Sequence, residues 1–454
     1  MIPIVTPDDM RAIDLAAPEG LKVLVDRAGR EVARVALSML RGSYGRRVAI
    51  ICGKGNNGAD GLVAAGVLEA RGIRVEILAP DVVWPSDQSF DLVIDAAFGT
   101  GLRDSYDAPR VPRGIPVLAV DIPSGVDGLS GLANGSPLAA TRTVTFGALK
   151  PGLLLADGKR LSGELDVSSL GLDISRATAW LVEAADVVRW LPHRDQAAHK
   201  WKASVWVVAG SPGMQGAARL VAAAAQRAGA GMVRLGSPGC APDPFAPTEV
   251  ITRGLPADGW AADVLADLKR FQAMIVGPGL GRLNAAVGGV RQLVNAARLP
   301  IVIDADGLLA VSVGDGGAAE LLKSRVHPTV LTPHDSEFSM LFGEMPGADR
   351  MTSCRYLAAR TGSVVLLKGP TTIIASPDGR QYVVTEGDER LATAGTGDVL
   401  AGILGGLLAR GTPAFEAAAA AAFLHGRAAK LGHPDGFVAS DLIDLLPAAF
   451  DSIR

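Results

Sequence analysis

Cysteine is scarce in this chain of 454 residues, which contains only three: Cys52, Cys240 and Cys354. They are too far apart, and odd in number, for a disulfide framework, and they lack the close spacing of metal ligands. Few cysteines without such a framework are typical of proteins in a reducing compartment, so we expect a cytoplasmic location.

The sequence also lacks a long apolar segment. Its longest apolar run, VLAGILGGLLA at 399–409, is too short and too glycine-rich to cross a bilayer. The first residues, MIPIVTPDDMRAID, contain no signal-peptide core. The formal net charge is only −3, which gives no electrostatic basis for binding nucleic acid or an anionic membrane. We therefore expect neither kind of partner.

Short apolar runs alternate with helical or loop segments over the first part of the chain. The composition is 48% hydrophobic and 20% charged, as in a globular protein. Each run is almost continuously apolar, which is typical of strands buried on both faces of a parallel sheet. The alternation predicts a doubly wound α/β fold. The predicted strands lie at residues 46–52, 74–80, 91–99, 115–123 and 141–147.

A polar stretch, LPHRDQAAHKWK at 191–202, interrupts this pattern. It contains a proline and has no regular period, which is typical of a linker between domains. We therefore expect one domain at residues 1–190 and another at 195–454, which ends in a helix capped by Ser440. The predicted strands of the second domain lie at residues 204–211, 232–237, 271–279, 300–306, 329–334 and 363–376.

Polar residues and glycines follow three of the predicted strands in the first domain. GKGNNGADG follows one strand at residues 53–61, Asp95 and the glycine loop 99–105 end a second, and Asp121 and Ser124 end a third. Each feature alone is most simply a turn or a helix cap. The carboxyl ends of parallel strands share one edge, where open α/β sheets bind ligands, so together they predict a ligand site.

The residue types suggest two functions for that site. Asn57, Asp95 and Ser124 offer only hard oxygen atoms, which suit an alkali or alkaline-earth cation and not zinc. The backbone N–H groups of the glycine loop suit a phosphate or pyrophosphate. Asp121 is left as a candidate acid or base. Lys150, in LKPG, could be a further active-site cation, but it is most simply a surface lysine before a turn.

A glycine-rich helix start, AGTGDVLAG at 394–402, is the main feature of the second domain. Free backbone N–H groups there favour an anion, and Asp398 in the first turn could act as a base toward a hydroxyl group being phosphorylated. Alternatively, Asp398 is only a partner of the helix dipole. KGPTT at 368–372 suits a nucleotide, and His334 lies between a predicted strand and a helix. No GxxxxGK[ST] phosphate loop is present.

The motifs of both domains resemble those of the NAD(P)H-hydrate repair enzymes. NNGADG, DAAFGTG and DIPSG are similar to motifs of that family's epimerase half. GSPGMQGA, GPGLG, TPHDSEF, KGPTT and AGTGDVLAG are similar to motifs of its dehydratase half. The resemblance implies an α/β fold with two domains, an N-terminal Rossmann-like three-layer sandwich and a C-terminal ribokinase-like α/β domain.

The resemblance also implies a function in metabolite repair. The N-terminal half would interconvert (R)- and (S)-NAD(P)HX, the hydrated forms of NADH and NADPH. The C-terminal half would dehydrate the S epimer with ADP, giving AMP and phosphate through a phosphorylated intermediate. The implied partners are NADHX, NADPHX and ADP, with K⁺ in the epimerase domain and Mg²⁺ in the dehydratase domain. The family likeness also suggests self-association into a homo-oligomer.

The same resemblance implies site residues, with Asp121 and Asp398 as the catalytic candidates and Asn57, Asp95 and Ser124 as the potassium ligands. In the first half the hydrated dinucleotide would contact Asn56, Asn57, Gly58, Ala59, Asp60, Gly99, Thr100, Gly101, Leu102, Arg103, Asp104, Ser105 and Asp121. In the second half it would contact Ala217, Gly279, His334 and Asp398. The adenine nucleotide would contact Lys368, Gly369, Pro370, Thr371, Thr372 and Gly397.

One residue departs from the epimerase motif, because Ala59 stands where the family has the second glycine of NNGGDG. A positive φ at this position would put epimerase activity in doubt, whereas a negative φ would make the methyl group harmless. Two alternative functions remain. The protein could be a ribokinase-like kinase that phosphorylates a vitamin-precursor alcohol, or its N-terminal half could be a binding module without catalysis.

Overall fold

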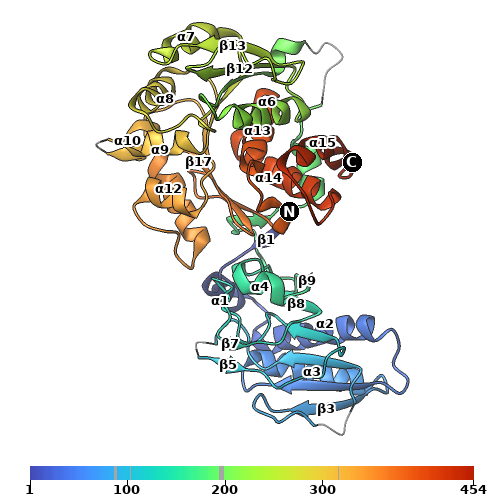
Figure 1. The fold of residues 1–454 in the computed structure, drawn as a ribbon. Coiled ribbons are helices and arrows are strands. Elements are labelled where there is room, and N and C mark those ends of the chain that lie inside the picture. Colours follow the sequence, from blue (N-terminus) through green and yellow to red (C-terminus); the bar gives the residue numbers. More distant parts are fainter. Residues whose placement is uncertain (86–88, 103, 194–198, 315) are drawn as a thin grey trace. The chain divides into compact units, whose positions relative to one another are not determined.

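The computed structural model describes residues 1–85, 89–102, 104–193, 199–314 and 316–454. The chain divides into two compact units, Ile2–Trp180 and Leu181–Arg454, and Met1 groups with the second (Figure 1). Among the described residues, no helix combines the length and the hydrophobicity that a membrane span requires.

The N-terminal unit contains a parallel sheet with the strand order β3-β2-β4-β6-β8-β9. All five strands predicted for this domain are present. The strands of the unit are β1 (Ile2–Ile4), β2 (Arg47–Cys52), β3 (Arg74–Leu78), β4 (Leu92–Ala96), β5 (Tyr106–Asp107), β6 (Val117–Val120), β7 (Gly135–Ser136), β8 (Arg142–Phe146) and β9 (Glu164–Ser168), and β10 (Ala179–Leu181) ends at the unit boundary. The helices are α1 (Pro7–Ala16), α2 (Leu21–Leu40), α3 (Asn56–Glu69) and α4 (Ala156–Leu161).

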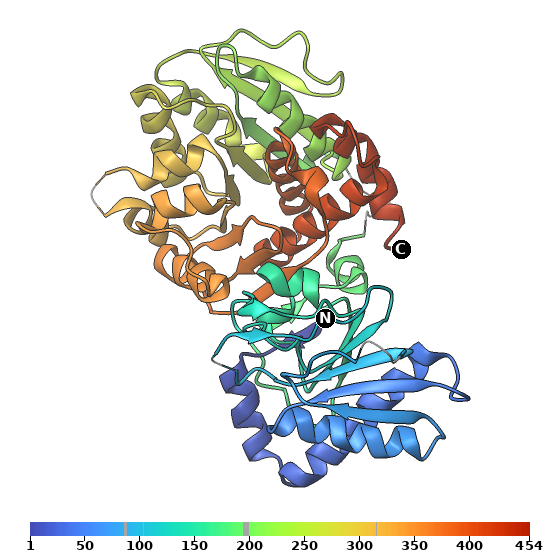
Figure 2. The same cartoon turned by 60° about the horizontal axis from the view of Figure 1, so that its bottom comes forward.

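Helices α2 and α3 cover one face of this sheet, and Figure 2 shows both on the same side of the strands. Val32 and Ala36, one turn apart on α2, are buried against Ile50 and other strand residues. Gly29 lets the two helices approach closely, because a β-carbon there would lie 2.4 Å from Cβ of Val63. The opposite face packs on a second cluster that includes Phe90. The carboxyl edge of the strands is left for the loops that carry the predicted motifs.

The C-terminal unit is built on a larger mixed sheet. Its strands run in the order β19-β18-β17-β16-β15-β14-β11-β12-β13, parallel from β13 to β17 and antiparallel from β17 to β19. The strands are β11 (Ser204–Val208), β12 (Met232–Pro238), β13 (Ile251–Leu255), β14 (Ala273–Val276), β15 (Ile301–Ile303), β16 (Thr329–Leu331), β17 (Val364–Leu367), β18 (Thr372–Ala375) and β19 (Gln381–Val384). The run predicted at 363–376 is therefore two antiparallel strands, β17 and β18, which turn around KGPT.

Helices cover both faces of this sheet. Figure 1 shows α8, α9 and α12 on one side of β17 and α6, α13 and α14 on the other. Gly402 of α13 packs directly on α6, since a β-carbon there would lie 2.4 Å from the carbonyl oxygen of Val221. The helices are α5 (Ala184–Trp190), α6 (Gln215–Arg227), α7 (Trp260–Asp267), α8 (Asn284–Ala296), α9 (Asp306–Ser312), α10 (Gly317–Lys323), α11 (Asp335–Phe342), α12 (Arg350–Thr361), α13 (Thr396–Ala409), α14 (Ala414–Leu431) and α15 (Ala439–Asp451).

The predicted cap of the closing helix is wrong by two residues. Helix α15 begins at Ala439, and its N-cap is Val438. The carboxylate of Asp441 accepts the backbone N–H of Val438 at 2.9 Å. Because Asp441 satisfies that donor, Ser440 lies inside the first turn and does not cap the helix.

Candidate active sites

A cavity of about 690 Å³ opens at the carboxyl edge of the N-terminal sheet. It confirms that the motifs predicted after three separate strands meet in space, although a role for each residue stays a prediction. Of the predicted residues, it is lined by Asn56, Asn57, Asp60, Gly99, Thr100, Gly101, Leu102, Asp104 and Asp121. Gly58, Ala59 and Ser105 do not line it, and Arg103 lies outside the described residues. The cavity is also lined by Asp14, which no motif of the sequence marks, and by Lys150, for which the sequence favoured a surface position over an active-site one.

Asn57, Asp95 and Ser124 come together beneath this cavity. The fully buried Asp95 carboxylate accepts hydrogen bonds from the Ser124 hydroxyl at 2.6 Å and from the Ser124 backbone N–H at 2.9 Å. The Asn57 amide donates to the carbonyl of Val120 at 2.9 Å, and its Oδ1 lies near Gly99. The Ser124 hydroxyl also lies 3.0 Å from the carbonyl oxygen of Phe98.

This oxygen cluster fits a hard cation. Within the described residues, no basic side chain forms an ion pair with Asp95, and burial raises the pKa of its carboxyl group. A buried carboxylate without a positive partner is unfavourable, so a cation bound by these oxygens would compensate its charge. The donors are amide, carboxylate, hydroxyl and carbonyl oxygens, which suit K⁺ in type.

Lys150 is not a surface residue, and that prediction was wrong. Its side chain is 1% exposed, and its ammonium group lies 2.5 Å from Oδ1 of Asp121. The same ammonium donates to the hydroxyl of Thr145 and to the carbonyl of Phe146, both at 2.9 Å. Thr145 in turn donates to Asp121 at 3.0 Å. Three acceptors therefore engage the three N–H donors of Lys150, and they hold the Asp121 carboxylate at the edge of the cavity.

Asp121 itself has an unusual backbone. Its φ is 65°, in the left-handed region that only a few per cent of non-glycine residues occupy, although Asp is among the types that tolerate it. Its backbone N–H donates to the carbonyl of Val144 at 2.7 Å, which ties this residue to the neighbouring strand β8. The turn after β6 thereby directs the carboxylate toward Lys150.

Ala59 lies inside helix α3 and is not among the residues with positive φ. The methyl group of Ala59 is therefore compatible with the backbone, and the doubt that a positive φ would have raised about epimerase activity does not arise. The strict requirement for glycine falls one residue earlier, because a β-carbon on Gly58 would lie 1.9 Å from the carbonyl oxygen of Gly53. The first turn of α3 thus requires a glycine at position 58.

In the C-terminal unit, the predicted residues also gather at the carboxyl edge of the sheet. The Asp304 carboxylate, after β15, accepts from the Thr332 hydroxyl at 2.7 Å and lies 3.0 Å from the ammonium of Lys368. The Glu337 carboxylate lies 3.5 Å from the same ammonium. Burial alone would lower the pKa of Lys368, but the charges of Asp304 and Glu337 outweigh it and raise that pKa. The loops after three neighbouring strands thus share one charged network.

Asp398 occupies the first turn of α13, as predicted. Burial, with a smaller contribution from the charge of Asp304, raises the pKa of its carboxyl group to about 6, against an opposing effect of Lys368. Its Oδ2 lies 4.0 Å from the position that a β-carbon on Gly395 would take, and Leu220 of α6 lies beside the same position. A carboxyl group with a pKa near neutrality at a helix N-terminus is suited to accept a proton.

His334 and Glu337 form a reciprocal cap at the start of α11. The backbone N–H of His334 donates to Glu337 at 2.9 Å, and Nδ1 of His334 accepts the backbone N–H of Glu337 at 3.3 Å. The imidazole remains 54% exposed, and its Nε2 lies 3.5 Å from the Glu337 carboxylate. Because Glu337 also contacts Lys368, the cap links the imidazole to the charged network.

Ala217 and Gly279 are likewise brought together. A β-carbon on Gly279 would lie 3.2 Å from Cβ of Ala217, and the φ of Gly279 is +65°. The Gly279 carbonyl accepts the hydroxyl of Ser211 at 2.9 Å. The glycine loop after β14 therefore packs closely on the first turn of α6, and a side chain at Gly279 would not fit without displacing its neighbours.

Two residues near this site escaped the sequence reasoning. Arg350 of α12 pairs with Asp335 at 2.7 Å and donates to the carbonyl of Lys368 at 3.2 Å, beside Gly369. His425 is buried, its Nε2 lies 2.9 Å from the carbonyl of Thr396, and burial lowers its pKa to about 4. It therefore supports the turn before Asp398 as a neutral ring. Neither residue belongs to a glycine-rich or strand-end motif, so no local pattern marks it.

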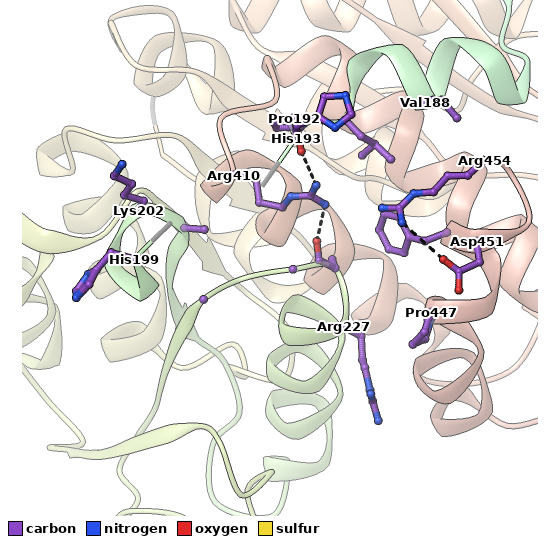
Figure 3. Close-up of a pocket in the computed structure, with 16 residues that line it drawn as sticks. Val188, Pro192, His193, His199, Lys202, Arg227, Arg410, Pro447, Asp451 and Arg454 are labelled. Atoms are coloured by element: carbon purple, nitrogen blue, oxygen red, sulfur yellow. Dashed lines mark hydrogen bonds and ion pairs between the residues drawn. The ribbon is translucent and has the colours of Figure 1, made fainter. Parts of the chain in front are cut away.

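A second cavity, of about 830 Å³, lies at the other end of α13, around Arg410 (Figure 3). The guanidinium of Arg410 donates to the carbonyls of Ala228 at 3.1 Å and Pro192 at 2.9 Å. Arg454 pairs with Asp451 at 3.7 Å. No predicted site residue lines this cavity, and Figure 3 shows its basic side chains pointing apart and not toward a common centre.

Protein-family profiles match both the N-terminal unit and the C-terminal unit. A protein-family profile described as NAD(P)H-hydrate dehydratase matches residues 205–447. A second profile, described as YjeF-related protein N-terminus, matches residues 21–88 and 80–152. The first match contains the charged network of the C-terminal unit, and the second contains the glycine loops, Asp121 and Lys150 at the cavity of the N-terminal unit but not Asp14 of α1.

Curated relatives match almost the whole chain. A protein of Mycobacterium leprae, named bifunctional NAD(P)H-hydrate repair enzyme Nnr, is 39% identical over 92% of this chain and 90% of its own length. A protein of Escherichia coli with the same name is 31% identical over 97% of this chain and 92% of its own. The order of both halves is therefore shared along the full sequence.

Solved structures match the C-terminal unit. An ADP/ATP-dependent NAD(P)H-hydrate dehydratase of Bacillus subtilis, co-crystallised with ATP and Mg²⁺, is 28% identical and covers 60% of this chain and 98% of its own, with a TM-score of 0.50. A ribokinase-like superfamily protein of Enterococcus faecalis, 22% identical, covers 61% of this chain and 97% of its own with a TM-score of 0.53. These matches confirm the predicted ribokinase-like fold of the C-terminal unit.

Proposed function

This chain belongs to the family of bifunctional NAD(P)H-hydrate repair enzymes, and on that premise we propose that it carries both activities of the family. Residues 1–190 form the epimerase domain, which interconverts (R)- and (S)-NAD(P)HX. Residues 195–454 form the dehydratase domain, which returns (S)-NAD(P)HX to NAD(P)H. The free thiols of Cys52, Cys240 and Cys354 fit a cytoplasmic enzyme.

Dehydration requires that a poor leaving group become a good one. The hydrated ring carries a hydroxyl at C6, next to the ring nitrogen. Asp398 accepts the proton of that hydroxyl while the hydroxyl oxygen attacks the terminal phosphorus of ADP, and AMP leaves. The N–H groups at the start of α13 stabilise the charge on the transferring phosphoryl group. The nitrogen lone pair then expels phosphate from C6, and loss of a proton from C5 restores the double bond.

The charged network around Lys368 suits the nucleotide. The ammonium lies 3.7 Å from the position of a β-carbon on Gly397, so it lies beside the backbone of the first turn of α13. Phosphate oxygens placed there would meet the ammonium and the helix N–H groups together. We assign Lys368–Thr372 and Gly397 to the nucleotide and Ala217, Gly279 and His334 to the dinucleotide. We expect the nucleotide to arrive as its Mg²⁺ complex, because Mg²⁺ in such sites is bound largely by substrate phosphates.

In the N-terminal domain, the cavity holds the hydrated ring and the glycine loop 99–105 holds the phosphates. The backbone of this loop lies beside Asn57, whose Oδ1 is 3.3 Å from the β-carbon position of Gly99. Asn57, Asp95 and Ser124 would hold K⁺ and so fix the loop over the substrate. The K⁺ would supply the positive charge that the buried Asp95 lacks. Asp121, oriented by Lys150, faces the ring.

The observation that carries this proposal is the placement of Asp398 in the first turn of α13, where its pKa is raised to about 6 beside Lys368. The test uses a mixture of both NADHX epimers with the purified protein, ADP, Mg²⁺ and K⁺. Complete return of NADH, faster than the epimers interconvert spontaneously, is expected if both domains act. If the return of NADH stalls after one epimer is consumed, the N-terminal half is a binding module without epimerase activity. A stable phosphorylated product without NADH would indicate a small-molecule kinase.

A further inference from the structure

The epimerase cavity carries an excess of carboxyl groups. Within the described residues, its charged lining consists of Asp14 and Arg11 on α1, Asp60 on α3, Asp104, Asp121 after β6 and Lys150 after β8. Arg11 is 63% exposed and lies 3.8 Å from Asp8, and Asp104 is exposed, so both belong to the solvent-facing part of the lining. The deeper part of the cavity is thus left with three carboxyl groups, those of Asp14, Asp60 and Asp121, and one ammonium.

That single ammonium is already engaged. Lys150 donates to Asp121, Thr145 and the carbonyl of Phe146, so it has no donor left for a further carboxylate. Asp60 is 6% exposed, and no ion pair or hydrogen bond of its side chain is found within the described part of the chain. Burial, with the charges of Asp121 and Asp14, raises its pKa to about 8. Asp60 therefore holds its proton at neutral pH, whereas the Asp121 carboxylate is paired with Lys150.

We propose that Asp60 is the general acid and base of epimerisation, which proceeds by loss and re-addition of water at C6 of the ring. This rests on the proposed function of the N-terminal domain. The C6–O bond breaks, its electron pair stays on oxygen, and oxygen takes the proton of Asp60 and departs as water. The nitrogen lone pair forms the N1=C6 double bond, which leaves a ring cation. Water then adds to either face, the N1=C6 pair returns to nitrogen, and the added water returns a proton to Asp60.

The surroundings of Asp60 favour this route over ring opening. The ring cation forms next to the Asp121 carboxylate and the newly ionised Asp60, which stabilise positive charge, while the three donors of Lys150 are engaged by Asp121, Thr145 and Phe146. Ring opening would instead break the N1–C6 bond and keep the oxygen on C6 as an aldehyde. It would call for a base on the hydroxyl, and a buried protonated carboxyl group is a poor base.

The test follows one purified NADHX epimer with the full-length protein and K⁺, without nucleotide, so that the dehydratase domain is idle. In water enriched in ¹⁸O, the wild type should place one solvent oxygen at C6 in each epimerisation. Product that retains its original oxygen would overturn the proposal, and this measurement needs no variant. Above about pH 8 the rate should fall, because Asp60 then loses its proton.

The variant Asp60→Asn keeps the size of the side chain but cannot donate a proton. Its epimerisation rate should fall at least about 100-fold, toward the spontaneous rate. Asp107→Asn, on the exposed part of β5 and away from the cavity, should match the wild type. A wild-type rate and pH profile in Asp60→Asn would refute the role of Asp60 alone. If the wild type itself does not exceed the spontaneous rate, the proposed epimerase function fails, and the two failures are thus distinguished.

Discussion

The ammonium of Lys368 lies 3.7 Å from the point where a side chain on Gly397 would begin. This distance is an ordinary contact, so a methyl group would fit at Gly397 without displacing the lysine. The methyl group would occupy the space between the ammonium and the first turn of α13, where we place the nucleotide. Gly397 therefore differs from the glycines of this helix that are needed for packing, because the space beside it is open to a ligand.

Gly397→Ala should therefore raise the KM for the nucleotide while the protein stays as stable as the wild type or gains up to about 1 kcal/mol from the better helix propensity of alanine. The matched variant is Gly402→Ala, whose methyl group would lie 2.4 Å from the carbonyl oxygen of Val221. That variant should lose about 1–3 kcal/mol of stability through overpacking. Thermal unfolding and nucleotide titrations check both. Loss of stability without a change in KM for Gly397→Ala would contradict the assignment.

Asp398→Asn should reduce dehydration by about 100- to 10,000-fold, because the variant cannot accept the hydroxyl proton. The wild-type rate should rise with pH through about pH 6 and level off above it, since the carboxyl pKa is raised to about 6 and the base must be ionised. Rates of NADH return from pH 5 to 8 check this. Epimerisation by the same variant should be unchanged, which serves as the internal control. A pH profile that is flat across this range would show that another group is the base.

Lys150→Met should destabilise the N-terminal unit by about 3 kcal/mol, because it leaves the Asp121 carboxylate with the Thr145 hydroxyl as its remaining partner in this network. The double variant Lys150→Met/Asp121→Asn should be more stable than the single one, since it removes the uncompensated charge. Calorimetric unfolding of the four proteins of this cycle measures the coupling. Additive effects would mean that the two side chains do not stabilise one another.

The fold could be predicted from the sequence because the patterns that indicate its strands are local. The strands β2, β4 and β14 are almost continuously apolar and are followed by glycines, and such runs identify buried parallel strands without knowledge of their neighbours. Strand β13, ITRGL, escaped because it lies at the sheet edge and is only partly apolar. The turn within 363–376 was also missed, since KGPT is short and both strands beside it are apolar.

The candidate sites could be predicted from the sequence only in part, because contacts between residues that are far apart in the chain leave no local pattern. Asp121 and Lys150 are 29 residues apart, and nothing near Lys150 shows that its side chain turns inward to that carboxylate. Asp14 lies on α1, far from any glycine loop, and reaches the cavity only through the fold. The φ at Ala59 likewise depends on where α3 begins, which the letters NNGAD leave open.

Ala59→Gly should therefore leave epimerisation unchanged and cost about 0.5–1 kcal/mol of stability, because glycine inside a helix gains backbone freedom on unfolding. Gly58→Ala should disrupt the loop, since its β-carbon would lie 1.9 Å from the Gly53 carbonyl oxygen. Epimerisation rates and thermal unfolding compare the two. A marked increase in the rate of Ala59→Gly would show that the methyl group does limit the enzyme.

K⁺ should stabilise the N-terminal unit through Asp95. A cation that binds only the folded state adds about 2.7 kcal/mol at 100 times its Kd, and Asp95 is a fully buried carboxylate with no basic partner among the described residues. Thermal unfolding in KCl should therefore shift upward relative to tetramethylammonium chloride at the same ionic strength, and Asp95→Asn should abolish the shift. Asp107→Asn, exposed on β5, should retain it. If Asp95→Asn responds to K⁺ as the wild type does, the ion binds elsewhere, and the buried Asp95 must then be protonated, in line with the direction in which burial moves its pKa.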